Sequence, residues 1–414
     1  LSIRWVLFAS LANGISNSYN LLKSDDVLAS INIIRKLGIK VNLKKNNCTI
    51  FGKGINGYKI KKNLILNAKN SGTLGRLILG SLVNYKEKIK LIGDKSLSKR
   101  DFKRVTDPLS KFGVYFKLHK GKTLPLYIRG TQNPTPITYF ENKGSAQCKS
   151  SIILAGLRTQ GTTLIKAKKS RNHTELMCKY LRLPINISIK KNYDLIKVKK
   201  AKKIKPLNYK IPSDISSATF FIVLTALSKN SSLTIKNVNI NSSRIGVIKI
   251  LKKMGVKILF KNRKEYKGEM IADIFVYSAT KIKPINCPTN LNSGAIDEFL
   301  AIFLVASKAS GVSFFKNLSE LNQKESPRLV WGSKLLNQMG IKNIMTKDSI
   351  KIFGNPELDI NKKITIKNYL KDHRVFMVSV ISALSFGGHW KIHDKDSINT
   401  SFPTFLDTIK VLQK

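Results

Sequence analysis

The sequence has few cysteines, few acidic residues and no long hydrophobic run, and each shortage excludes a class of protein. Its four cysteines are scattered without a CxxC pair, which is typical of a reducing, cytoplasmic setting and predicts no cysteine metal site. The longest apolar run, FLAIFLVA at 299–306, is too short for a membrane span of about 20 residues. His389 and His393 stand four positions apart with no cysteine nearby, and we interpret them as structural.

Only 24 residues are acidic, against 74 that are lysine or arginine, so the formal net charge is +50. Such a charge attracts phosphates and would fit a nucleic-acid-binding protein. However, all but 13 of the basic residues are lysines, and they are spread over the whole length, as in IKVKKAKKIKPLNYKI. With no zinc finger, basic tail or basic motif interleaved with aromatics, we predict a solvated lysine surface that draws in small anions. We expect no nucleic acid and no membrane as partner.

One repeated pattern is an amphipathic helix that passes through a glycine into a short strand. Four copies are INIIRKLGIKV, DPLSKFGVYF, ILKKMGVKILF and KLLNQMGIKNI, with Gly38, Gly113, Gly255 and Gly340. Each glycine fits the left-handed residue that follows a helix, and β-branched strand residues come next. A degenerate copy, MCKYLRLPINISI, and the tail PTFLDTIKVLQK supply a fifth and a sixth helix of this type.

A second kind of helix recurs with nearly the same period and has a polar start and a long apolar body. Its six copies begin near residues 2, 72, 145, 214, 297 and 372. Because they are apolar almost all round, we predict that they are buried. Stretches such as NCTIFG, TLIKA and SLTIKNV supply strands between them. The pattern predicts an α/β (α+β) chain of six units of roughly 70 residues, three in each of two domains, 1–212 and 213–414.

The polar starts of the buried helices indicate anion binding, because a helix N-terminus presents unpaired N–H groups and partial positive charge. The stretch NSGTLGRLILG at 70–80 shows the pattern and carries Arg76 one turn into the helix. In a chain so rich in lysine, an arginine suggests that the planar guanidinium itself is needed, as for phosphate or carboxylate. Six arginines lie in or beside polar motifs: Arg4, Arg76, Arg100, Arg171, Arg328 and Arg374.

Two nucleotide-binding motifs can be set aside. GKGING at 52–57 matches GxGxxG, but the following YKIKKNLIL predicts a strand where a dinucleotide site needs a helix. Neither GxxxxGKS nor GxxxxGKT occurs, which argues against a P-loop.

Taken together, the motifs resemble those of the 5-enolpyruvylshikimate-3-phosphate synthase family over essentially the whole chain. NLLKSDDVLASINIIRKLG, NSGTLGRL, SAQCKSSIILAGL, SRNHTE, SDISSATFF, KESPR, DHR and TSFP occur in the family's order, and SAQ with SRNHTE resembles its class II branch. The resemblance implies the two-domain enolpyruvyl transferase fold, an inside-out α/β barrel of six βαβαββ units, three per domain. The repeat count obtained from the pattern alone agrees with it.

The resemblance implies transfer of a carboxyvinyl group from phosphoenolpyruvate to the 5-hydroxyl of shikimate 3-phosphate, with release of phosphate. It implies no metal or organic cofactor, and we expect a monomer whose two domains close on the substrates. By the same resemblance, the residues that bind phosphoenolpyruvate are Asn70, Gly72, Arg100, Gln147, Arg328 and Arg374. Those that bind shikimate 3-phosphate are Ser2, Arg4, Ser145, Ala146, Gln147, Arg171, Asp297 and Lys324.

The implied reaction needs two positioned acid/base groups, one for the attacking hydroxyl and one for the methylene carbon. Asp297 and Glu325 occupy the family's positions for them. By resemblance, Asp297 would accept the hydroxyl proton and Glu325 would shuttle a proton at the methylene. From the residues alone, a helix cap for Asp297 and a solvated surface charge for Glu325 are the alternatives.

The chain departs from the family pattern in three places. Pro327 stands where KESDR has an aspartate, which tightens the loop and removes a carboxylate beside Arg328. Leu77 replaces a proline that is frequent in the class I motif, which we expect to be harmless. The chain opens with Leu1 inside a predicted helix, so we expect it to lack the family's PGDK-S segment and the lysine of that segment.

Two other kinds of function stay open at this point. UDP-N-acetylglucosamine enolpyruvyl transferase shares fold and chemistry, but no cysteine here lies in anything like its catalytic loop, and SRNHTE and KESPR favour shikimate 3-phosphate. A nucleic-acid-binding protein or an RNA-phosphate cyclase relative would instead use the basic surface.

Overall fold

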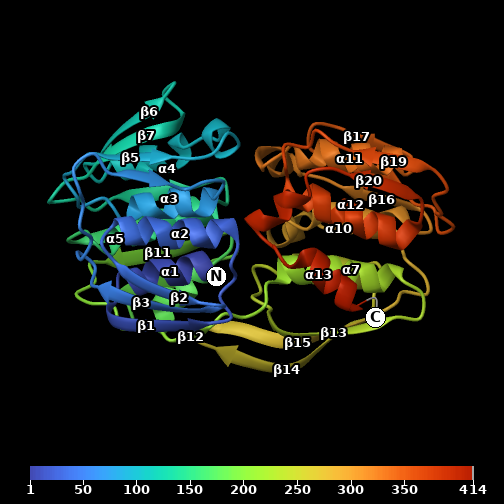
Figure 1. Ribbon diagram of the computed structural model, residues 1–414, viewed down its shortest axis with the longest axis horizontal. Helices are drawn as coiled ribbons and strands as arrows, with labels where there is room; N and C mark the ends of the chain where they lie inside the picture. Colours follow the sequence, from blue (N-terminus) through green and yellow to red (C-terminus); the bar gives the residue numbers. More distant parts are fainter. Residues whose placement is uncertain (413–414) are drawn as a thin grey trace. The chain divides into compact units, whose positions relative to one another are not determined.

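The computed structural model divides the chain into two compact units, Leu1–Ile211 and Pro212–Lys414, and describes residues 1–412 (Figure 1). The division falls one residue before the boundary expected from the sequence. We describe each unit by itself, because each has its own helices, sheets and buried core.

Unit 1 contains three four-stranded sheets built to one plan. The first has the order β12(Tyr209–Lys210), β1(Asn13–Tyr19), β3(Asn47–Lys53), β2(Lys40–Lys44), with helices α1(Ser2–Ser10) and α2(Asp25–Lys36). The second has the order β4(Ile65–Asn67), β5(Ile89–Ile92), β7(Thr123–Arg129), β6(Tyr115–His119), with α3(Gly72–Gly80), η1(Leu97–Lys99) and α4(Lys103–Ser110). The third has the order β10(Ile185–Ile189), β11(Tyr193–Lys199), β9(Thr162–Lys168), β8(Thr138–Glu141), with α5(Ala146–Gly156) and α6(His173–Tyr180).

The pairing in these sheets confirms the βαβαββ plan. In the second and third sheets one parallel pair joins the strands on either side of a buried helix. The first sheet also has one parallel pair, and the other pairs in all three sheets are antiparallel. The first sheet takes its parallel partner, β12, from the far end of the unit. Tyr209 therefore closes a repeat whose helices lie about 200 residues earlier, which short-range sequence patterns do not indicate.

Unit 2 repeats the plan with smaller sheets. Its first repeat contains α7(Ile215–Leu227), β13(Ser232–Asn239), α8(Gly246–Lys253), β14(Ile258–Tyr266) and β15(Glu269–Tyr277). Its second contains η2(Thr289–Leu291), α9(Asn292–Ala295), α10(Phe299–Ser307), β16(Val312–Phe315), η3(Ser319–Gln323), α11(Arg328–Gln338), β17(Asn343–Met345) and β18(Ile350–Phe353). Its third contains β19(Lys363–Ile366), α12(His373–Phe386), β20(His389–Ile392), η4(Lys395–Thr400) and α13(Phe405–Leu412).

The opening strands of unit 2 are shortened. Single parallel bridges, Ser213 with Val238 and Asn286 with Phe314, stand where unit 1 has a paired strand. The last repeat has the parallel pair β19 and β20, and no hairpin follows α13 in the residues that the structure describes. We expected several strands in every repeat, but within residues 1–412 the sixth repeat has the pair β19 and β20 alone.

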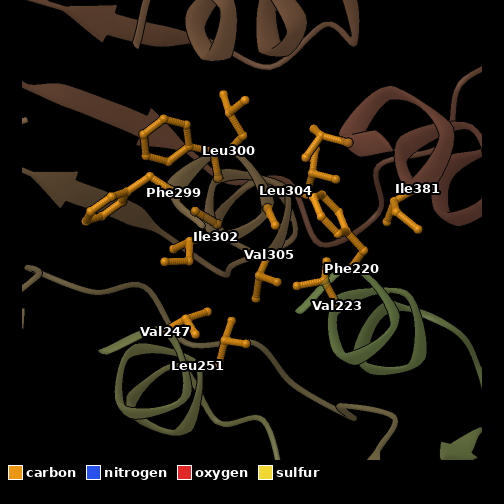
Figure 2. Close-up of a cluster of buried hydrophobic side chains, with 14 of the residues drawn as sticks. Phe220, Val223, Val247, Leu251, Phe299, Leu300, Ile302, Leu304, Val305 and Ile381 are labelled. Atoms are coloured by element: carbon orange, nitrogen blue, oxygen red, sulfur yellow. The ribbon is translucent and has the colours of Figure 1, made fainter. Parts of the chain in front are cut away.

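Buried helices form the centre of each unit, as their apolar sequences predict. In unit 1, α3 contacts α1 and α5, and in unit 2, α7, α10 and α12 contact one another. Every residue of α10 is buried. Figure 2 shows Phe299 and Val305 of this helix among Phe220 of α7, Leu251 of α8 and Ile381 of α12.

The amphipathic helices end as predicted. Gly38, Gly113, Gly255 and Gly340 have φ values of 83°, 91°, 95° and 84°, which is the left-handed region that a glycine enters without steric cost. In the degenerate copy, Arg182 takes this role with φ 53°.

The strand predicted from YKIKKNLIL is mostly wrong. Residues 58–64 have no regular structure, and only Ile65–Asn67 pairs, as β4. Tyr58 explains the difference, because its ring is buried on Tyr85 and its hydroxyl lies 2.7 Å from Ser10 Oγ. Tertiary packing thus overrides the local preference. No helix follows GKGING, so the argument against a dinucleotide site holds.

Three further findings concern residues 1–412. No helix there is both long and apolar enough to cross a membrane. No cluster of histidine, cysteine, aspartate or glutamate in that part of the chain could hold a metal ion. The cysteines Cys48, Cys148, Cys178 and Cys287 are all buried thiols.

We predict that Gly80→Ala destabilises unit 1. A Cβ at Gly80, in the last turn of α3, would lie 2.0 Å from the backbone oxygen of Ser151 in α5. The two helices must then separate, and such overpacking costs about 1–3 kcal/mol. Urea denaturation followed by circular dichroism should show a lower midpoint. Gly75→Ala in the same helix is the control, because its Cβ would come no closer than 3.3 Å, to Phe102; equal midpoints for the two variants would contradict the prediction.

Candidate active site

The first turn of α3 brings two guanidinium groups against Gly72. Ser71 caps the helix by accepting a hydrogen bond from Leu74 N, as the polar start predicts. A Cβ on Gly72 would lie 2.9 Å from NH1 of both Arg76 and Arg100. The absent side chain leaves room for two cations beside a helix N-terminus, which is a setting that suits an anion.

The side chain of Gln147, from α5, also reaches the first turn of α3. Its Nε2 donates to Thr73 Oγ1 at 3.0 Å, and its Oε1 accepts from Arg76 NH1 at 2.7 Å. Arg100 NH2 donates to Asn70 Oδ1 at 3.2 Å. The structure thus brings together the four residues of unit 1 that we predicted to bind phosphoenolpyruvate: Asn70, Gly72, Arg100 and Gln147.

The residues of unit 1 predicted to bind shikimate 3-phosphate lie at or near three helix starts. Ser145 caps α5 by accepting from Cys148 N, and its own N–H donates to the buried Glu141 carboxylate at 2.8 Å. Ala146 begins α5, Arg171 lies half-buried in the loop before α6, and Ser2 is buried in the first turn of α1.

Arg4 of α1 is held by the other two helices. Its Nε donates to Thr174 Oγ1 of α6 at 2.8 Å, and Thr174 Oγ1 lies 2.7 Å from Ser150 Oγ of α5. One turn further in, Lys149 of α5 and Glu175 of α6 form an ion pair at 2.6 Å that is almost wholly buried. This pair ties together the two helices whose starts carry Ser145 and Arg171, and the sequence reading did not identify it.

In unit 2, Arg328 is the centre of a charged cluster. Its guanidinium is only 2 % exposed and donates through Nε to Asp372 Oδ2 at 2.9 Å and through NH2 to Asp372 Oδ1 at 3.2 Å. The same guanidinium contacts Asp297 Oδ1 at 3.3 Å and the Glu325 carboxylate. Both predicted acid/base residues therefore share one cation.

The other predicted residues of unit 2 meet at Asp297. Lys324 Nζ lies 3.3 Å from Asp297 Oδ1, and Arg374 NH1 donates to the Asp297 backbone oxygen at 2.8 Å. Arg374 also lies 3.8 Å from the buried Glu298 carboxylate, which accepts a hydrogen bond from Ser216. One small pocket at the starts of α7, α10 and α12 is lined by Ser216, Asp297, Glu298 and Arg374, but not by Lys324.

Electrostatics fix the protonation of two residues in this cluster. Burial alone would raise the pKa of Asp372, but the Arg328 guanidinium holds it below its ordinary value. Burial lowers the pKa of the neighbouring His373 to about 4. At neutral pH, Asp372 is therefore an anion paired with Arg328, and His373 is neutral.

Pro327 does not disturb the placement of Arg328. It has φ −70° and directly precedes α11, which is a position that suits proline because the first N–H groups of a helix have no partner within it. The adjacent Ser326 Oγ donates to Asp372 Oδ2 at 2.8 Å. Asp372 therefore supplies a carboxylate beside Arg328 although the chain has no aspartate at 327.

Sequence reasoning missed the residues that hold these side chains in place. Asp372 was visible as the first letter of DHR, and it proves to cap α12 through Arg374 N while pairing with Arg328. Glu298 followed a chosen residue directly. Arg76 was noted as an unusual arginine, but its bond to Gln147 joins positions 71 residues apart and leaves no local signal.

Comparison with known proteins decides the family. The family described as EPSP synthase (3-phosphoshikimate 1-carboxyvinyltransferase) matches residues 1–409. The chain belongs to the EPSP synthase family. A 3-phosphoshikimate 1-carboxyvinyltransferase from Ruthia magnifica subsp. Calyptogena magnifica is 39% identical over 408 residues, which are 98% of this chain and 92% of the relative. One from Caldicellulosiruptor bescii is 36% identical over 412 residues, 99% of this chain and 93% of the relative.

Solved structures agree with this assignment. The EPSP synthase of Acinetobacter baumannii matches with a TM-score of 0.87 and 33% identity, over 99% of this chain and 92% of that one. The enolpyruvyl transferase NikO from Streptomyces tendae matches with a TM-score of 0.77 but only 15% identity, over 99% of this chain and 92% of that one, and shows the shared fold alone. Membership in the EPSP synthase family makes the chain a transferase of the shikimate pathway, which serves aromatic amino acid biosynthesis.

We predict that His373 makes unit 2 less stable in mild acid. Its pKa of about 4 in the folded chain lies below the ordinary 6.5, so the unfolded chain binds a proton more readily between these values. The stability that neutral His373 supports is present above pH 6.5 and is lost as the pH falls toward 4, by up to about 3 kcal/mol.

Urea denaturation at several pH values tests this prediction. His373→Asn should flatten the fall in stability between pH 6.5 and 4, whereas His119→Asn, at an exposed histidine of unit 1, should not. Parallel curves for the wild-type chain and His373→Asn would contradict the prediction.

Proposed function

We propose that this chain transfers the carboxyvinyl group of phosphoenolpyruvate to the 5-hydroxyl of shikimate 3-phosphate and releases phosphate. The observation that carries the proposal is the shared contact of Asp297 and Glu325 with the Arg328 guanidinium. It supports the assignment of these two carboxylates as the acid/base pair, because both lie within reach of one point in the site.

Unit 1 supplies the groups that we assign to the phosphates. Gly72, Asn70 and Arg100 would bind the phosphate of phosphoenolpyruvate, with backbone N–H groups of α3 as further donors. Ser145, Ala146, Arg171, Ser2 and Arg4 would bind shikimate 3-phosphate. Gln147 would contact both substrates, because its amide stands between the α3 and α5 starts.

Unit 2 supplies the groups that we assign to the carboxylate and the protons. Arg374 and Arg328 would bind the carboxylate of phosphoenolpyruvate, and Lys324 would help to bind shikimate 3-phosphate. Arg328 already pairs with three carboxylates, and we expect a substrate carboxylate to exchange with one of them. Asp372 is fully buried, whereas Glu325 is 19 % exposed, so Glu325 is the partner that water can replace most easily.

That exchange gives Glu325 its function. A substrate carboxylate that takes its place at Arg328 would release the Glu325 carboxylate to exchange a proton with the methylene carbon. In the proposed reaction, the 5-hydroxyl oxygen bonds to C2 of phosphoenolpyruvate while Asp297 takes the hydroxyl proton and Glu325 protonates the methylene carbon. Glu325 then removes a proton from the resulting methyl group, the double bond re-forms, and the C2–O bond to phosphate breaks. The leaving phosphate takes up the proton that Asp297 holds, which returns both carboxyl groups to their starting states.

Phosphate release in the presence of phosphoenolpyruvate and shikimate 3-phosphate tests the function. Asp297→Asn and Glu325→Gln should each lower kcat by about 100-fold or more, since general acid–base catalysis contributes 10²–10⁴-fold. The matched controls Asp396→Asn and Glu357→Gln change exposed carboxylates and should keep kcat. Wild-type release that needs only one of the two substrates would refute the proposal.

We further predict that Arg100→Lys strongly lowers activity although it keeps the positive charge. The guanidinium can make two parallel bonds to a phosphate, whereas an ammonium group is a point donor. Loss of one charged hydrogen bond costs about 1.5–3 kcal/mol, which should lower kcat/KM for phosphoenolpyruvate by about 10- to 100-fold. Arg35→Lys, at an exposed arginine of α2, is the control. Near-normal kcat/KM for Arg100→Lys would remove Arg100 from the phosphate site.

A further inference from the structure

Arg76 has a role that the assignment of substrate-binding residues does not use. Its guanidinium donates through NH1 to Gln147 Oε1 at 2.7 Å and to Gly72 O at 3.4 Å, and through NH2 to Asp101 O at 3.2 Å. The guanidinium also lies over the Phe102 ring, 5.2 Å from its centroid. Four contacts from two nitrogens and one flat face hold it in a single orientation.

The atoms that accept hydrogen bonds from Arg76 are neutral oxygens. None of these bonds therefore pairs the positive charge of the guanidinium with an acidic group. Burial, together with the positive charges of Arg100 and Arg104, lowers the pKa of Arg76 to about 10. It is still a cation at neutral pH, and a cation cannot accept a hydrogen bond.

Because the Arg76 guanidinium cannot accept a hydrogen bond, it decides which way the Gln147 amide is turned. An amide can present either its oxygen or its NH2 group to a neighbour, but only the oxygen can face a guanidinium. The NH2 group is consequently the end that bonds Thr73 Oγ1, at 3.0 Å, and one of its two N–H bonds remains to donate elsewhere. Arg76 and Thr73 together allow one orientation of the amide.

We propose that Arg76 is a positioning residue that fixes the Gln147 amide with its NH2 group as a donor to the anionic substrates. The inference rests on the proposed function, in which Gln147 contacts two phosphorylated carboxylates. With the amide reversed, Gln147 would present an oxygen to these anions and repel them. An arginine is needed, because its fork reaches the Gln147 oxygen and the Asp101 oxygen at once, whereas a lysine offers one nitrogen.

A double-mutant cycle on kcat/KM tests whether Arg76 acts through Gln147. Gln147→Met removes the amide, and we expect it to lower kcat/KM by about 10- to 100-fold, with Arg76→Met alone causing a similar loss. In the Gln147→Met background, Arg76→Met should then cost about threefold or less, because no amide is left to position. Fully additive losses would overturn the proposal, since Arg76 would then act on the substrates or the fold directly. An unchanged kcat/KM for Gln147→Met would also overturn it.

Gln147→Glu tests the donor orientation separately. A glutamate keeps the contact with Arg76 as an ion pair but has no N–H to donate, so we expect it to be as impaired as Gln147→Met. Activity near the wild-type level would show that the NH2 group is not the functional end.

A crystal structure of Arg76→Met gives a readout that does not depend on activity. We expect the Gln147 amide to leave Thr73 or to reverse against it, since the Thr73 hydroxyl can also donate; neutron diffraction, which locates the amide hydrogens, distinguishes these cases. An amide that still donates to Thr73 would overturn the proposal even if the wild-type chain proved inactive in the phosphate-release assay. Arg158→Met is the matched control for stability. Arg158 is also buried in unit 1 and donates to Asn84 Oδ1 at 2.7 Å, so its loss should lower the thermal midpoint while leaving kcat/KM unchanged.

Discussion

The burial of helices that are apolar on every side is the constraint on which the rest of each unit depends. A helix such as α10 has no polar face to turn toward water, so other helices and the sheets must surround it. Two acidic residues, Asp297 and Glu298, stand just before its first turn and must find partners there. The starts of neighbouring helices therefore bond one another. Gln147 of α5 bonds Thr73 of α3, and Arg374 of α12 bonds the backbone oxygen of Asp297, two residues before α10.

The charged groups at the helix starts differ between the two units. In unit 1, the guanidinium groups of Arg76 and Arg100 converge on Gly72 and bring positive charge to the start of α3. In unit 2, Arg328 meets three carboxylates, and in the proposed function a substrate anion exchanges with one of them. The first arrangement favours tight binding of a dianion. The second would free a carboxylate when a substrate anion binds, which suits proton transfer.

The sequence predicts the features that depend on neighbouring residues and misses those that depend on contacts across the chain. The buried helices, the Ser71 cap and the glycine after each amphipathic helix follow from local pattern, and the structure confirms them. The strand expected after residue 57 fails because Tyr58 is drawn into the core by Ser10 and Tyr85. The residues chosen within each unit do converge, but Asp372 and Glu298, which hold them, were not chosen, because nothing local distinguishes a buried carboxylate from a helix cap.

The presence of arginine in a lysine-rich chain helps to identify site residues, but it is not sufficient alone. Arg328 uses all three guanidinium nitrogens and Arg76 uses two, and no lysine could replace either without losing bonds. Yet Arg158 is equally buried and bonds Asn84 and two tyrosine rings, with no substrate-binding residue among these contacts. Lys149, in contrast, is wholly buried against Glu175 between the helices that carry Ser145 and Arg171. The residues that a buried basic side chain contacts therefore indicate its role. Arg76 and Arg328 contact side chains that we assign to substrate binding or proton transfer, whereas Arg158 contacts groups that support the core.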